Sequence, residues 1–185
     1  MKNRIFDINT NKWKIFSIVS TIGFIIDFYT KYLASTQLQF GIAVPVIGNV
    51  LQFQLVYNKG ALFGLNPQSI SPAFPVNLFF YIISAIAIVI LLIFYRHTEP
   101  DAKLTCWGTA FIMPGALGNL FDRIIRPSKG VVDFIKMDFH FWPFNPWPNY
   151  NMADAYITVG LIMIITDMFI QYTIQKKTKK EIEIT

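Results

Sequence analysis

The chain has 185 residues, of which 54% are hydrophobic and only 15% are charged, against about 25% in ordinary soluble domains. This length fits a single domain, 1–185, and the long apolar blocks indicate an integral membrane protein. The net charge of +5 comes largely from lysines near the two ends, and no motif that reads nucleic acid accompanies it. We therefore expect no nucleic-acid partner.

Four apolar blocks predict four transmembrane helices, over about 13–34, 74–95, 104–123 and 154–174. Asp27 and Lys31 interrupt the first block near its far end, which favours an uncleaved anchor over a signal peptide. Lysines before the first block and after the fourth predict that both termini are cytoplasmic. Four basic residues on the predicted outer side run against this trend: Arg123, Arg126, Lys129 and Lys136.

The connection over about 36–72 is predicted to form an outward-facing β element. An apolar residue at every second position predicts a half-buried strand through Leu51, Phe53, Leu55 and Tyr57. Val44 and Val46, on either side of Pro45, predict an earlier edge strand. A small sheet lying on the membrane surface is the expected result.

The second outer connection, over about 124–153, is predicted to be a loop. Its stretch 139–148 is rich in aromatic residues and proline, which excludes a regular helix and suits the lipid headgroup region. The predicted fold class is therefore an all-α membrane protein of four transmembrane helices. It carries a small outward-facing β-sheet domain and an aromatic and proline-rich outer loop.

Polar residues interrupt the apolar pattern at five places. Asp27 and Lys31 lie four residues apart and can pair on one helical face. Asn58 precedes Gly60 in a stretch that permits a tight turn. Each of these features, taken alone, is compatible with a purely structural role.

The third polar stretch ends the third apolar block with Asn119, Asp122 and Arg123. Because Asp122 and Arg123 are adjacent, we predict a structural ion pair that keeps Asp122 ionised and makes it a poor proton carrier. Small residues just before this stretch are typical of close helix packing in a bilayer.

The last two stretches supply two carboxylates beside apolar segments, where a charge is costly and indicates function. Asp133 has apolar neighbours and no adjacent arginine, so a raised pKa is expected. Asp154 follows Asn151 at the start of the fourth block, where an aspartate also fits a simple helix cap. If the two carboxylates meet, they can share a proton and activate water.

Other hydrolytic sites are not indicated. The chain has neither a Gly-x-Ser-x-Gly elbow nor a His-Glu-x-x-His zinc motif. Cys106 lies in an apolar block without a histidine nearby in sequence, and His97 and His140 are too far apart for metal-ligand spacing. No metal and no cofactor are predicted.

Together, the five stretches resemble those of lipoprotein signal peptidases, also called signal peptidase II. Asp27 with Lys31 matches the first family motif, and the others match at 58–63, 118–123, 131–134 and 151–154. Three residues depart from the usual pattern, namely Leu62, Pro114 and Tyr150. The resemblance covers almost the whole chain, and all five motifs occur in the family's order.

The resemblance implies a catalytic dyad of Asp133 and Asp154. The residues implied to line or support the site are Asp27, Lys31, Asn58, Gly60, Asn119, Asp122, Arg123 and Asn151. The implied activity is that of an aspartyl endopeptidase, which cleaves a diacylglyceryl prolipoprotein just before its lipidated cysteine. Membrane lipid and a cyclic peptide inhibitor of the globomycin type are the other implied partners. The implied location is the bacterial inner membrane, with the active site near its outer face.

Two other functional classes remain open from the residues alone. Asp27, Asp133 and Asp154 could form a proton relay in a small transporter, although the polar residues gather at the outer ends of the predicted spans. A passive assembly partner would leave the polar stretches unexplained. Within the dyad, Asp122 remains the alternative to Asp133.

Overall fold

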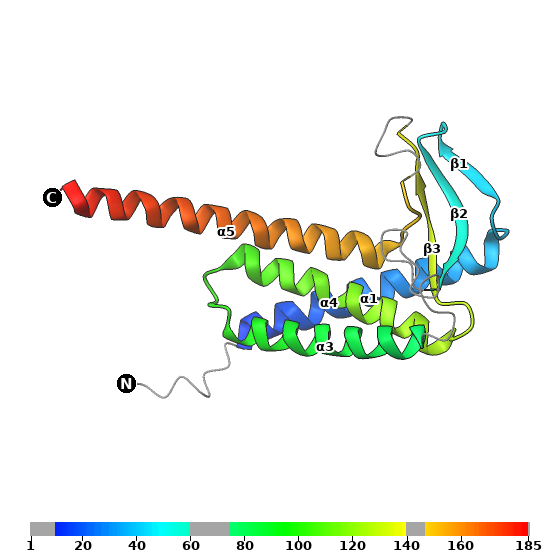
Figure 1. Cartoon of the computed structure of the whole chain (residues 1–185), viewed down its shortest axis with the longest axis horizontal. Helices are drawn as coiled ribbons and strands as arrows, with labels where there is room; N and C mark the ends of the chain where they lie inside the picture. Colours follow the sequence, from blue (N-terminus) through cyan, green and yellow to red (C-terminus); the bar gives the residue numbers. More distant parts are fainter. Residues whose placement is uncertain (1–9, 60–74, 140–146, 185) are drawn as a thin grey trace.

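The computed structural model describes residues 10–59, 75–139 and 147–184. Within these residues, four helices run side by side along the long axis, and a small sheet lies at one end of them (Figure 1). The helices are α1 (Thr10–Gln37), α3 (Val76–His97), α4 (Lys103–Ile125) and α5 (Met152–Ile184). The strands are β1 (Ala43–Ile47), β2 (Leu51–Asn58) and β3 (Val131–Met137). A mostly helical fold with a small sheet was predicted and is confirmed.

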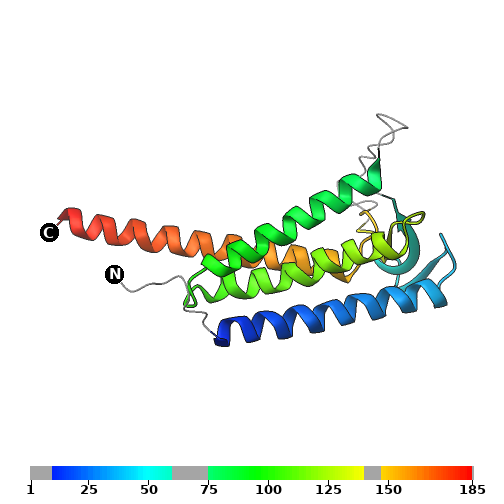
Figure 2. The same cartoon turned by 90° about the horizontal axis from the view of Figure 1, so that it is seen from below.

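Helix α4 lies at the centre of the helical part and contacts α1, α3 and α5 (Figure 2). Most positions between Gly108 and Gly115 are buried, including Pro114 inside the helix. By contrast, most of α3 is exposed at the surface and strongly apolar. This difference fits a central helix that is shielded by its neighbours.

Glycines bring the helix backbones into direct contact. A Cβ on Gly160 of α5 would lie 2.5 Å from the carbonyl oxygen of Gly108 in α4, so neither position has room for a side chain. A Cβ on Gly23 of α1 would likewise lie 2.8 Å from the ring of Pro114. Small residues therefore set the spacing of α4 from its two neighbours, as they do in many membrane helices.

The sheet is antiparallel with the order β1-β2-β3, and its strands run across the ends of the helices (Figure 1). The predicted strand through Leu55 and the predicted edge strand through Pro45 are both confirmed. A cluster of Ala34, Leu55, Val132 and Phe134 joins the sheet to the end of α1. This cluster attaches β2 and β3 to the helices.

Strand β3 corrects the prediction of a loop over 124–153. Its first four residues, 131–134, are all buried, so the strand lacks the alternation of buried and exposed positions that reveals a half-buried strand. A register shift between Phe53 and Val56 of β2 places Val56 opposite Asp133. Residues 140–146, most of the aromatic and proline-rich stretch, lie outside the described residues.

Within the described residues, three helices are long and apolar enough to cross a membrane: Asn11–Gln37, Val76–His97 and Met152–Lys179. Helix α4 is not among them, although it extends over the predicted third span. Helix α5 is longer than the predicted span 154–174, because its lysine- and glutamate-containing tail also favours a helix.

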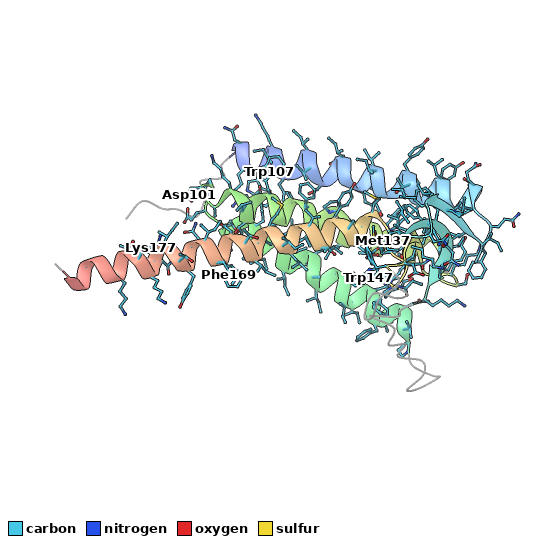
Figure 3. The ribbon with its side chains drawn as sticks, turned by 90° about the horizontal axis from the view of Figure 1, so that it is seen from above. Asp101, Trp107, Met137, Trp147, Phe169 and Lys177 are labelled. Carbon is cyan, nitrogen blue, oxygen red and sulfur yellow. The ribbon has the colours of Figure 1, made fainter. Side chains whose placement is uncertain are left out.

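Labelled side chains locate the two ends of the helical part (Figure 3). Met137 and Trp147 lie at the sheet end, whereas Asp101 lies at the opposite end (Figure 3). Lys177 lies farther out, on the part of α5 that extends beyond the other helices (Figure 3). The first residues of α1 and the last of α5 share the end away from the sheet (Figure 1).

Candidate active site

The polar motifs that are far apart in sequence converge where the sheet meets the helices. Helix α1 supplies Asp27 and Lys31, and β2 ends at Asn58. Helix α4, strand β3 and the start of α5 supply the remaining members: Asn119, Asp122, Arg123, Asp133, Asn151 and Asp154. Gly60, the last predicted site residue, lies outside the described residues.

Asn151 and Asp154 close the N-terminus of α5 by reciprocal hydrogen bonds. The backbone amide of Asp154 donates to Asn151 Oδ1 over 3.0 Å, and the backbone amide of Asn151 donates to Asp154 Oδ2 over 3.2 Å. This is a capping-box arrangement, in which each residue satisfies the other's amide. The cap that the sequence suggested is therefore real, and it also holds the Asp154 carboxylate in place.

Asn151 also links Asp154 to Asp133. Its side-chain amide donates to Asp133 Oδ1 over 2.7 Å, and it lies 3.2 Å from the carbonyl oxygen of Val132. Asn151 is fully buried, so these bonds are shielded from water. One asparagine thus contacts both carboxylates, through its side chain on one and its backbone on the other.

Asn119 approaches Asp154 from α4. Its amide donates to Asp154 Oδ1 over 2.8 Å, while its own oxygen accepts from Lys31 Nζ over 3.0 Å. The Asn151 amide is also 3.2 Å from this oxygen. Hydrogen bonds therefore connect α1, α4 and the N-terminal cap of α5 around the Asp154 carboxylate.

Asp27 anchors the first turn of α5 to α1. Its Oδ1 accepts from the backbone amide of Ala153 over 2.8 Å, and its Oδ2 lies 2.8 Å from Lys31 Nζ. The predicted i,i+4 ion pair is therefore present, and it is almost completely buried. A Cβ on Gly118 would collide with Asp27 Oδ2, so this contact needs a glycine in α4.

Asp122 corrects one sequence interpretation. Its ion-pair partners are Arg126, one turn further along α4, and Lys31, at 3.4 Å, rather than the adjacent Arg123. Its Oδ2 accepts from the backbone amide of Val132 over 3.0 Å, which ties α4 to β3. Neighbouring residues on a helix point in different directions, whereas residues four apart share a face.

Arg123 lies on another side of the site. Its guanidinium stands 4.5 Å from the centre of the Phe80 ring and donates to the carbonyl oxygen of Asn119 over 3.0 Å. Its positive charge is still felt by Asp133 and Asp154. Arg123 therefore supplies a nearby cation to the carboxylates without pairing directly with either in the described contacts.

Burial dominates the electrostatics of Asp133, a residue that is only 3% exposed. It raises the pKa of the Asp133 carboxyl to about 7, and the negative charge of Asp154 acts in the same direction. Hydrogen bonds from Asn151 and Asn58 and the charge of Lys31 oppose this rise in pKa. A carboxyl with such a pKa can hold a proton near neutral pH, as a general acid must.

A cavity of about 560 Å³ lies beside this cluster, at the N-terminal end of α3. It is lined by Lys59, Pro75, Val76, Asn77, Leu78, Tyr81, Pro127 and Ser128. Neither Asp133 nor Asp154 lines this cavity. The candidate active site is therefore the hydrogen-bonded cluster and not the cavity.

The chemistry of the cluster is that of paired carboxylates. Among the residues that the structure describes, no three histidine, cysteine or acidic side chains are grouped to hold a metal ion. Sequence reasoning missed Arg126 and the Val132 amide as partners of Asp122. The spacing of four residues between Asp122 and Arg126 would have indicated their ion pair. The bond from the Val132 amide depends on where β3 lies against α4, which the sequence does not show.

The other buried aspartate, Asp167, lies away from the cluster, toward the opposite end of α4 and α5. It accepts hydrogen bonds from the hydroxyl and backbone amide of Thr105, near the start of α4. This arrangement satisfies an otherwise free helix-terminal amide. It explains the burial of Asp167 without a second functional site.

Fold and site together define a multi-pass membrane protein with an acid–base cluster at one end of its helices. A family model described as signal peptidase (SPase) II matches residues 19–170. This match covers most of the chain, and the chain belongs to the signal peptidase II family, a family of proteases.

Individual relatives agree with this assignment. The lipoprotein signal peptidase of Geobacillus kaustophilus is 34% identical over 82% of this chain and 91% of its own length. That of Syntrophotalea carbinolica is 35% identical over 83% of this chain and 90% of its own length. The resemblance seen in the motifs is thereby confirmed, and the transporter alternative receives no support.

Solved structures show the same fold. A bacterial membrane enzyme determined by the in meso method superposes with a TM-score of 0.71 at 27% identity. The match covers 83% of this chain and 87% of the other. A second structure of this description has a TM-score of 0.70 and covers 91% of its own chain.

Proposed function

We propose that this chain is an aspartyl endopeptidase that removes the signal peptide from diacylglyceryl prolipoproteins, cleaving just before the lipidated cysteine. Family membership supports the removal of signal peptides from prolipoproteins. The aspartyl chemistry rests on one observation: Asn151 bonds to Asp133 through its side chain and to Asp154 through its backbone.

In the proposed reaction, Asp133 and Asp154 share one proton, because two neighbouring carboxylates are costly to ionise together. The ionised member accepts a proton from water as the water attacks the scissile carbonyl. The protonated member donates to the carbonyl oxygen. The tetrahedral intermediate then breaks its C–N bond as the leaving amine is protonated, and no covalent enzyme intermediate is needed.

The supporting residues have separate tasks in this proposal. Asn151 and Asn119 orient the carboxylates by hydrogen bonds. Asp122 holds β3, and therefore Asp133, against α4 through its bond to the Val132 amide. This structural task favours Asp133 over Asp122 as the partner of Asp154.

The test is cleavage of a synthetic diacylglyceryl prolipopeptide by purified variants in detergent. Asp133→Asn and Asp154→Asn should each lose about a thousandfold or more in rate, since each removes a proton-transfer group. Asp167→Asn is the matched control, because Asp167 is also buried between α4 and α5 but lies away from the site. Mass spectrometry should find a free amine on the lipidated cysteine. Full activity of Asp133→Asn would overturn the assignment.

We further propose four membrane spans, with α4 as the additional one. Its 23 residues rise about 34 Å, enough for the hydrocarbon core. Its three helical neighbours shield its polar side chains, which lowers the hydropathy it needs. Both termini would then be cytoplasmic in the bacterial inner membrane, with the sheet and the dyad near the outer face.

Cysteine labelling of intact cells tests this topology in a Cys106→Ser background. Asp101→Cys lies in the turn before α4 and Ser128→Cys in the turn after it, and both positions are exposed. An impermeant maleimide should label Ser128→Cys in intact cells and Asp101→Cys only after permeabilisation. Labelling of both from one side would show that α4 does not span.

Two partners follow from this proposal. The diacylglyceryl chains of the substrate would lie in membrane lipid beside the helices while the signal helix docks laterally. A cyclic peptide inhibitor of the globomycin type should compete for the same site. Competitive inhibition of the prolipopeptide assay tests this, and unaltered cleavage at saturating inhibitor would argue against it.

A further inference from the structure

The orientation of the Asn119 amide is forced by its neighbours. Lys31 Nζ, 3.0 Å away, is an ammonium that can only donate, so the Asn119 atom facing it must be the oxygen. The Asn151 amide donates to the same oxygen over 3.2 Å. The NH₂ group of Asn119 must therefore face Asp154 Oδ1, at 2.8 Å.

Lys31 itself has little freedom. Its side chain is 2% exposed, and two carboxylates hold its ammonium, Asp27 at 2.8 Å and Asp122 at 3.4 Å. Its third contact is Asn119. An ammonium has three protons to donate, and these contacts account for all three.

The two catalytic candidates have different surroundings. Asp154 is the third residue of α5, where the helix N-terminus favours a negative charge, and it accepts from Asn119 and from the Asn151 backbone. Asp133 lies on a strand, is more deeply buried, and has no helix N-terminus of its own. Lys31 and Arg123 are the cations near the pair. These differences favour the negative charge on Asp154.

We propose that Lys31 acts through Asn119 as a positioning residue that makes Asp154 the ionised general base and leaves Asp133 as the protonated general acid. This division of roles rests on the proposed peptidase function. It assigns the base to Asp154 and the acid to Asp133, whereas a shared proton alone does not say which carboxylate has which role.

The proton movements balance without any further reactant. Water gives one proton to the Asp154 carboxylate while its oxygen bonds to the carbonyl carbon, and Asp133 gives its proton to the carbonyl oxygen. When the C–N bond breaks, the proton on Asp154 passes to the leaving nitrogen. One hydroxyl proton of the intermediate returns to Asp133, which restores the starting state.

The test is the pH profile of kcat for the diacylglyceryl prolipopeptide. The acidic limb reports ionisation of the base and the alkaline limb reports ionisation of the acid. Asn119→Leu has a similar shape and no charge change but removes the hydrogen bond to Asp154. The acidic limb should move up by about one pH unit, while the alkaline limb stays. An upward move of the alkaline limb alone would reverse the roles and overturn the proposal.

A second variant isolates Lys31. The double substitution Asp27→Asn with Lys31→Met removes the ammonium and one of its carboxylates together, which preserves the net charge of the buried site. It should move the acidic limb in the same direction as Asn119→Leu. Adding Asn119→Leu to it should give a combined shift smaller than the sum of the two separate shifts, because both act on one hydrogen bond. Fully additive shifts would show that Lys31 does not act through Asn119.

Two controls keep the outcomes separate. Asp167→Asn should leave both limbs in place, and circular dichroism in detergent should show that each variant is folded. If the wild type does not cleave the prolipopeptide, the proposed function fails. If the wild type cleaves it and folded Asn119→Leu keeps the wild-type profile, only the role of Lys31 and Asn119 fails.

Discussion

The backbone amide of Ala153 in α5 donates a hydrogen bond of 2.8 Å to the carboxylate of Asp27 in α1. These residues are 126 positions apart, and their bond fixes the first turn of α5, where Asp154 lies. Asp27 also receives the ammonium of Lys31 at 2.8 Å. The position of one catalytic candidate therefore depends on a buried ion pair in the first helix.

Gly118→Ala tests this dependence. A Cβ at this position would collide with Asp27 Oδ2 and push Asp27 away from Ala153. Alanine favours a helix by about 1 kcal/mol over glycine, but we expect net destabilisation of about 1–3 kcal/mol from overpacking. Cleavage should fall at least tenfold. Ala85→Val, on the exposed face of α3, is the control and should leave both quantities near wild type.

Asn151→Ala should abolish most activity because it removes the hydrogen bond from the Asn151 side chain to Asp133. It also removes one of the two capping hydrogen bonds of α5, the one from the Asp154 backbone amide to Asn151 Oδ1. Loss of the cap should cost about 1 kcal/mol in unfolding free energy. Prolipopeptide cleavage and thermal unfolding in detergent measure the two effects. Asn149→Ala is a matched control two residues away, where the side chain contacts Gln54 instead. Equal losses in both variants would contradict a specific role for Asn151.

Arg126→Gln should weaken the attachment of β3 to α4. Arg126 pairs with Asp122, whose other oxygen accepts from the Val132 amide next to Asp133. We expect a loss of about 1–3 kcal/mol, as for a hydrogen bond to a buried charge. Hydrogen exchange should increase in β3 more than in β1. Unchanged protection of the Val132 amide would contradict this account.

Asp133→Asn should change how stability depends on pH. The pKa of Asp133 is raised from 3.8 to about 7, mainly by burial, so the folded protein binds this proton more tightly than the unfolded chain. Its contribution to stability is full below about pH 4 and is lost as the pH rises through about 7. The variant carries no titratable group at this position, so its free energy of unfolding does not fall in this way. Relative to the wild type, its free energy of unfolding should therefore rise by a few kcal/mol from pH 4 to pH 8. Thermal unfolding at several pH values measures this; parallel curves would contradict a raised pKa.

Much of the architecture follows from local patterns in the sequence. The long apolar blocks predicted the helices, since helix length and hydropathy are properties of neighbouring residues. Alternation of apolar and polar residues predicted β2, whose apolar face includes the buried Leu55. The same rule failed for β3, which is buried on both faces over its first four residues.

The sequence by itself determined which polar side chains interrupt the apolar blocks, and their order along the chain identified the family. Only the tertiary structure decided their partners: Asp122 pairs with Arg126 and not with Arg123, and Asn151 contacts both Asp133 and Asp154. Apart from the cap of α5 and the i,i+4 pairs, these contacts join residues from different helices and strands. Their geometry is set by how closely α1, α4 and α5 pack, which the glycines at their crossings permit.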